Sequence, residues 1–169
     1  TLSGVYTFSG DTTVDGGTLD LVGPYRFPSG NVVNINNGST LQISGTGLFE
    51  FGGNTFNFGA GGGNTINLAS GFNLVTSGNN TSTSAAGTTS NTSQGAQFNT
   101  NGGAAAGTWT INVADGAAAE DLIISNTITN GGSIDKQGAG ALVLSGDSNY
   151  TGTTTVTAGT LLVNGNNGS

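Results

Sequence analysis

The stretch GAGALVLSGDSNYTGTTTVTAGTLLVNGNNGS, residues 138–169, decides the fold. Its hydrophobic residues come in short alternating pairs, such as Leu142 with Leu144 and Leu161 with Val163, and glycines separate the pairs. Alternation with a period of two residues is typical of β-strands with one buried face. Glycine tolerates the sharp turns between such strands. The stretch therefore predicts a succession of short strands joined by tight corners.

The same pattern occurs near the start of the chain. Residues 3–23 align without gaps to residues 145–165, and ten of the 21 positions are identical. The aromatic Phe8 also falls opposite Tyr150. Glycines and apolar positions keep register together, which indicates two copies of one structural repeat.

Short alternating pairs fill the rest of the chain: Val33/Ile35, Leu41/Ile43, Phe49/Phe51, Phe56/Phe58, Ile66/Leu68, Phe72/Leu74 and Trp109/Ile111/Val113. No segment shows the helical spacing of apolar residues over a sufficient length. The nearest candidate is Ala117–Ile124, and it reads equally well as a loop leading into a strand at Leu122–Ser125.

Strands with only two inward side chains cannot build a thick core by themselves. They suit a parallel β-solenoid, in which each coil buries its side chains against equivalent positions of the coils above and below. Asn and Thr are expected to form stacked hydrogen-bonding ladders between coils. We therefore expect an all-β chain with residues 1–169 forming a single β-solenoid segment. A β-sandwich is the alternative, because strands recurring every 8–12 residues also suit that fold.

Residues 76–107 differ from the rest, because Phe98 is their only large apolar residue. The stretch is rich in Ser, Thr, Asn and Gly. It is either an excursion from the solenoid or a set of coils with a polar core, and its composition favours the excursion. Partial order is expected near Gly95–Asn99, where Phe98 can dock on the main body.

Charge and composition exclude several classes of function. The net charge is −7 and the only basic residues are Arg26 and Lys136, so nucleic acid and anionic membrane surfaces are not expected partners. No apolar run is long enough to span a bilayer. The chain has no Cys and no His, so disulfides, the usual catalytic triads and the usual zinc sites are excluded. We expect neither enzymatic activity nor a cofactor or metal.

The remaining candidates for chemistry are few. Asp115, Glu120 and Asp121 lie close in sequence, but no calcium-loop motif is present, so a solvated acidic surface is expected. The glycine-rich run at 59–63 lacks the Lys-Ser/Thr ending of a phosphate loop and is expected to be a turn. Candidate ligand contacts are the cluster Tyr25, Arg26 and Phe27, together with Trp109 if it is exposed.

The run DKQGAGALVLSGDSNYTGTTTVTAGTLLVNG, residues 135–165, closely resembles the autotransporter-associated β-strand repeat of bacterial passenger domains. The best match covers residues 123–165, and a degenerate copy covers 1–23. The matching positions include Lys136, Gly138, Gly140, Leu142, Leu144, Gly146, Asn149, Tyr150, Gly152, Val156, Gly159 and Leu161. The resemblance implies a right-handed parallel β-helix that is exported to the cell surface or beyond.

For function, the resemblance implies a structural module: a stalk, fibre or scaffold segment of a longer passenger protein that assists passenger folding. Its expected location is extracellular or at the bacterial cell surface, associated with the outer membrane. Adjacent coils or further copies of the chain are the expected partners, stacked head to tail on open sheet edges. Lys136 is expected to lie along the solenoid with its charge in water. The alternative function is an adhesin that recognises a glycan or a surface.

Overall fold

The structure is a computed structural model, and it describes residues 1–3, 10–23, 25–27, 30–44, 48–52, 54–77, 80–87, 89–99, 107–129 and 131–166. Each pair of neighbouring strands among these residues is parallel. Successive turns of the chain therefore stack on one another as a right-handed parallel β-helix, as expected. A β-sandwich is built from antiparallel strands, so the alternative fold is wrong.

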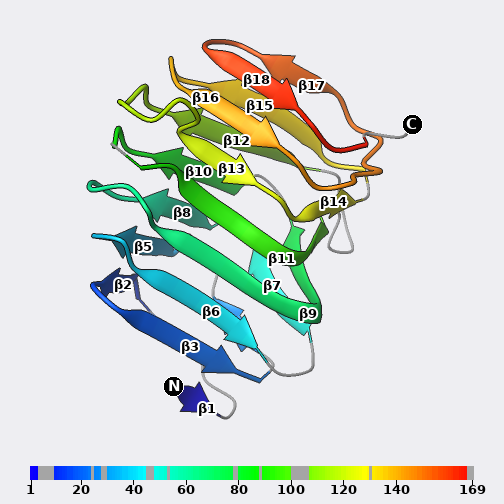
Figure 1. The fold of residues 1–169 in the computed structure, drawn as a ribbon. Helices are drawn as coiled ribbons and strands as arrows, with labels where there is room; N and C mark the ends of the chain where they lie inside the picture. Colours follow the sequence, from blue (N-terminus) through cyan, green and yellow to red (C-terminus); the bar gives the residue numbers. More distant parts are fainter. Residues whose placement is uncertain are drawn as a thin grey trace.

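Two long sheets form the main sides of the solenoid (Figure 1). The back sheet runs, in spatial order, through β17 (Thr154–Val156), β15 (Ser133–Gln137), β12 (Thr108–Val113), β10 (Asn80–Ser84), β8 (Thr55–Phe58), β5 (Val32–Asn36) and β2 (Thr12–Asp15). The front sheet runs through β1 (Leu2–Ser3), β3 (Thr18–Val22), β6 (Thr40–Ser44), β9 (Thr65–Ser77), β11 (Asn91–Asn99), β13 (Leu122–Ile124), β16 (Ala141–Leu144) and β18 (Thr160–Val163).

A short third side continues the front sheet in the middle of the solenoid. Its strands are β4 (Tyr25–Phe27), β7 (Leu48–Gly52) and β14 (Thr127–Thr129), together with the second halves of β9 and β11. The backbone of Phe98 pairs with Leu74 on one side and with Ile128 on the other. The order expected around Phe98 is therefore present in the backbone.

The core consists of side chains that stack in columns from coil to coil. In the back sheet one column runs Val33, Phe56, Ser82, Ile111 and Lys136. In the front sheet another column runs Leu41, Ile66, Ser93, Ile124 and Leu144. The apolar members of both columns are buried. Each fully buried Leu, Ile or Phe side chain contributes about 1.5–3 kcal/mol, so the stacked coils stabilise one another.

The described part of residues 76–107 corrects the expectation of an excursion. It contains β10 and β11, which pair with the coils on both sides. The interior of this coil is polar: Ser82, Ser84, Asn91 and Ser93 are all buried. Side-chain hydrogen bonds satisfy these residues, so small polar residues can occupy core positions without an unpaired group.

The structure also decides between the two interpretations of Ala117–Ile124. Leu122–Ile124 is strand β13, and the residues before it form a corner between β12 and β13. Pairing with β11 and β16 favours the strand over a helix of marginal length.

Candidate functional site

The aromatic and basic residues singled out as ligand contacts lie in different sheets. Tyr25, Arg26 and Phe27 form β4 of the front sheet, whereas Trp109 belongs to β12 of the back sheet. The β4 backbone pairs in register with Phe49–Phe51. The side chains of β4 lie outside the described residues, so their role in ligand contact stays a prediction.

Trp109 is a candidate for ligand contact only if its side chain is exposed, and the side chain is buried. Its side chain is only 6% exposed, and its indole Nε1 donates a hydrogen bond to Ser82 Oγ at 2.9 Å. The ring belongs to the core and offers no stacking platform at the surface. Trp109 is buried beside the neighbouring coil, whose interior is polar. The small Ser82 of that coil accepts the hydrogen bond of the indole.

The apolar residues of the C-terminal repeat are buried or partly buried as expected, with two exceptions. Leu142 and Leu144 are buried, and Leu161 and Tyr150 are partly buried against the core. The Tyr150 hydroxyl lies 2.6 Å from Thr154 Oγ1. Val156 and Val163 are 47% and 46% exposed, because no described coil covers them on the side beyond β17 and β18.

Asn149 and several glycines of the repeat have backbone roles. The backbone N–H of Asn149 donates to the Ile128 carbonyl at 3.0 Å. A Cβ atom at Gly146 would overlap the Asn126 carbonyl of the coil beneath, and one at Gly152 would overlap the Gly132 carbonyl. Stacked corners approach so closely that only glycine fits between them.

Lys136 corrects the expectation of a solvated charge. Its side chain is fully buried, at 0% exposed, in the column that includes Ile111. Its Nζ donates hydrogen bonds to three backbone carbonyls, those of Gln137 at 2.7 Å, Gly138 at 2.8 Å and Ala158 at 3.1 Å. Burial lowers the pKa of Lys136 below its ordinary value of 10.5, and the negative charge of Asp121 opposes this effect. One feature of the sequence does indicate burial. Lys136 stands two residues after Ile134 in the same strand, so the two side chains point to the same face.

Asp121 is a second buried charged residue that sequence reasoning placed in water. It is 4% exposed, and its carboxylate accepts the N–H of Gly116 at 2.9 Å and the N–H of Ala141 at 2.8 Å. The Asp121 side chain therefore joins its own corner to the corner of the next coil. Asp115, by contrast, is exposed.

A ladder of polar side chains lines the interior of the corner between the back and front sheets. Gly16 N–H donates to Ser39 Oγ at 2.7 Å, and Gly38 N–H donates to Asn64 Oδ1 at 3.0 Å. Both the backbone N–H and the Nδ2 of Asn64 donate to Asn91 Oδ1, at 3.0 and 2.9 Å. The expected ladder of Asn residues is present, and it caps the turns of successive coils.

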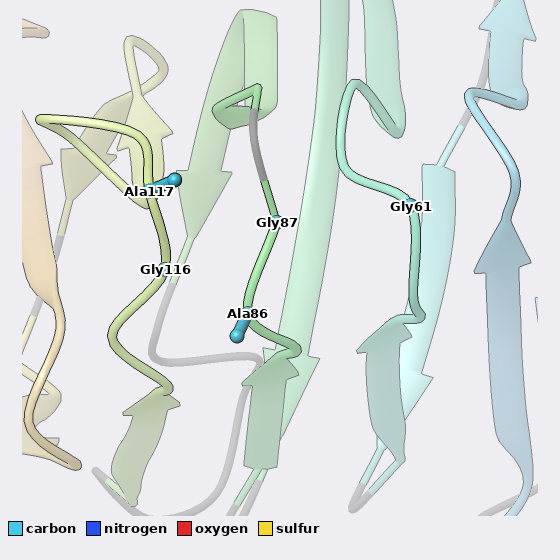
Figure 2. A pocket seen from close by; sticks show the side chains of 5 residues that line it. All are labelled: Gly61, Ala86, Gly87, Gly116 and Ala117. Carbon is cyan, nitrogen blue, oxygen red and sulfur yellow. The ribbon is translucent and has the colours of Figure 1, made fainter.

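The glycine-rich run at 59–63 is a turn between β8 and β9, as expected. Gly61 forms an isolated parallel bridge with Gly87. A shallow hollow of about 390 Å³ lies across these stacked corners. It is lined by Gly61, Ala86, Gly87, Gly116 and Ala117, which Figure 2 labels. The lining residues carry no polar side chain, so the hollow offers no side-chain group for catalysis or for binding an ion.

Within the described residues, no group of three or more carboxylate, His or Cys side chains is placed to hold a metal ion. Among the same residues, no helix has the length and hydrophobicity needed to cross a lipid bilayer.

The first and last coils have corresponding strand pairings. In the first copy Leu2 pairs with Leu21, and at the aligned positions of the second copy Leu144 pairs with Val163. The two copies differ in what covers them. Val14 and Leu21 are 6% and 0% exposed beneath the β5–β6 coil, whereas the aligned Val156 and Val163 are 47% and 46% exposed.

Comparison with protein families agrees with this geometry. The family model described as Passenger-associated-transport-repeat matches residues 1–21 and 134–163, which are the two copies. The resemblance of these segments to the autotransporter passenger repeat is therefore confirmed. No curated protein and no solved structure matches the chain significantly. The repeat and the β-solenoid fit a structural module of an autotransporter passenger.

Proposed function

We propose that this chain, with a passenger-associated transport repeat at each end, is a stalk or scaffold segment that receives a further β-solenoid coil on strands β17 and β18. Its place of action is outside the bacterial cell or at the cell surface. We include no catalytic activity in this function. The burial of Trp109 removes one of the parts on which a ligand-binding role would rest, so we propose no second function.

The comparison of the two copies carries the proposal. Val14 and Val156 are aligned valines on β2 and β17, the two end strands of the back sheet, yet they differ in exposure from 6% to 47%. Val14 pairs in register with Ile35 of the following coil, and it is on this following side that Val156 has no described neighbour. A coil with the same inward apolar pairs is therefore the partner that fits the open side of β17 and β18.

The outer edges of β17 and β18 support the same partner. Both strands occupy the end of their sheets in the described structure, so their outward backbone groups are free to extend a parallel ladder. Leu162 and Val163 in β18 are 38% and 46% exposed, so apolar surface and open backbone groups occur together. In the absence of further chain, a second copy stacked head to tail provides such a coil.

A graft tests whether a coil docks there. Residue 165 aligns with residue 23, so residues 24–44 are appended after residue 165 to reproduce the coil that covers Val14. The extended chain should melt about 4–8 °C higher, because two half-exposed valines become buried. The control graft carries serine in place of Val33, Ile35, Leu41 and Ile43. Equal melting temperatures for both grafts and the parent chain would refute the proposal.

A second experiment asks whether the partner is another copy of the chain. Sedimentation of the chain over a range of concentrations should show association, and Val163→Lys should abolish it by placing a charge in the contact. A stabilising graft with no self-association would leave the coil-accepting role and remove the head-to-tail copy as its partner.

A further inference from the structure

The three carbonyl oxygens around Lys136 Nζ come from two successive corners of the solenoid. The carbonyl of Gln137 lies at the end of β15, and the carbonyl of Gly138 lies in the corner between β15 and β16. The carbonyl of Ala158 belongs to the equivalent corner between β17 and β18. The Lys136 backbone joins the same two coils, since its carbonyl accepts the N–H of Thr157 at 2.8 Å.

The number and position of these oxygens match one chemical group. A primary ammonium carries three N–H donors and accepts no hydrogen bonds, and the corner offers three carbonyls at 2.7–3.1 Å. The side chain is fully buried, so water does not compete at the nitrogen. Burial of the ammonium lowers the pKa of Lys136, and the negative charge of Asp121 offsets part of this effect.

Glycines shape the corner around this group. Gly138 has a φ of 75° and Gly159 has a φ of 71°. Residues other than glycine rarely adopt this backbone conformation. A Cβ atom at Gly159 would overlap the carbonyls of Gly138 and Gly140. The two corners can therefore lie directly on each other, and the Lys136 nitrogen reaches both.

We propose that these stacked corners form a binding site for a primary ammonium group, which the chain fills with its own Lys136 and which locks the last repeat coil onto the coil beneath it. The site gives the Lys-x-Gly-x-Gly run a single physical purpose: the lysine supplies the donors and the glycines admit the close approach. This role is independent of whether a further coil docks on β18.

Amine acylation tests the site in the unmodified chain, because the sequence has one lysine. A water-soluble acetylating reagent should modify the α-amino group rapidly and Lys136 at least about a hundredfold more slowly, as expected for a group that reacts only after local opening. Peptide mapping by mass spectrometry measures both rates. In denaturant the two amines should react at comparable rates. Acylation of Lys136 in the folded chain at the rate of a free amine would overturn the proposal.

Chemical rescue tests the specificity for ammonium. Lys136→Ala removes the atoms that n-propylammonium contains, so this amine should raise the melting temperature of that variant by at least about 2 °C. The uncharged 1-propanol should not, and Lys136→Met should not respond because its side chain fills the space of the stem. If n-propylammonium shifts Lys136→Ala and Lys136→Met equally, or if 1-propanol is as effective as the amine, the site does not recognise ammonium.

Discussion

At the scale of single residues, Lys136 shows how a backbone can make a charged side chain part of a core. Desolvation of an ammonium is costly, but three carbonyl oxygens that would otherwise be buried at the corner accept its hydrogen bonds. Removal of the Lys136 side chain would leave an unfilled space and would take a hydrogen-bond donor from all three carbonyls.

The pKa of Lys136 predicts a pH dependence of stability. Burial lowers this pKa below 10.5, so the folded chain releases the proton at a lower pH than the unfolded chain. Between the two pKa values the unfolded state binds more protons, and the free energy of unfolding should rise with pH. Urea unfolding between pH 8 and 11 should show this rise in the wild type and not in Lys136→Met. A difference between the two proteins that shrinks with pH would mean that the carbonyls and Asp121 bind the proton more strongly than burial disfavours it.

Two aligned glycines predict opposite responses to alanine. A Cβ atom at Gly152 would overlap the Gly132 backbone, whereas Gly10 has no heavy atom within 4 Å of the added atom. Gly152→Ala should therefore destabilise the chain by about 1–3 kcal/mol. Gly10→Ala should be neutral or stabilise it by up to about 1 kcal/mol through the unfolded state. Thermal melting of both variants makes the comparison, and similar losses at the two positions would contradict it.

At the scale of strands and corners, side-chain ladders hold successive coils in register. Asn91 Oδ1 accepts two hydrogen bonds from Asn64 inside the corner, and Asn91 Nδ2 donates to Ser84 Oγ at 2.8 Å. On the outer surface Asn57 bonds Asn34 at 2.9 Å and Thr83 at 2.6 Å. The two amides make similar contacts, but only Asn91 is fully buried.

Burial predicts that the inner ladder matters more. Asn91→Ala leaves the buried donors of Asn64 without their acceptor and should cost about 2–3 kcal/mol. Asn57→Ala exposes its partners to water and should cost about 0.5 kcal/mol. Chemical denaturation of the two variants measures both values. Equal losses would show that the ladders act through strand pairing alone and not through burial.

At the scale of the whole molecule, the solenoid has a covered copy and an open copy of one repeat. The termini of the described chain lie at opposite ends of the stack (Figure 1). The coil in which β10 and β11 lie has a polar interior between two apolar regions of the core. Stability therefore varies along the stack, as expected of an assembly whose coils contact only their neighbours.

Alanine substitutions at the two aligned valines test this difference in stability between the ends of the stack. Val14→Ala removes a buried side chain and should cost about 2 kcal/mol, whereas Val156→Ala removes one that is already 47% exposed and should cost less than about 1 kcal/mol. In the chain extended by residues 24–44 the cost of Val156→Ala should rise to that of Val14→Ala. A cost that stays unchanged in the extended chain would show that the graft does not cover β17.

The sequence alone determined the class of the fold and the position of its repeats. The period-two alternation of Leu142 and Leu144 specifies which side chains point inward, and that information is contained in one strand. Glycines at the corners specify where the chain turns. These patterns are local, so they can be recognised in the sequence without knowing which coil lies above or below.

Only the tertiary structure decided which residues of neighbouring coils come into contact. The burial of Lys136, Asp121 and Trp109, and the polar interior at Ser82, depend on partners in neighbouring coils about 20–30 residues away. Composition assigns a lysine, an aspartate or a serine-rich stretch to water, because it counts the cost of desolvation and not the hydrogen bonds that stacking supplies. Backbone carbonyls and amides of the adjacent corner provide those bonds, and their positions exist only once the coils are stacked.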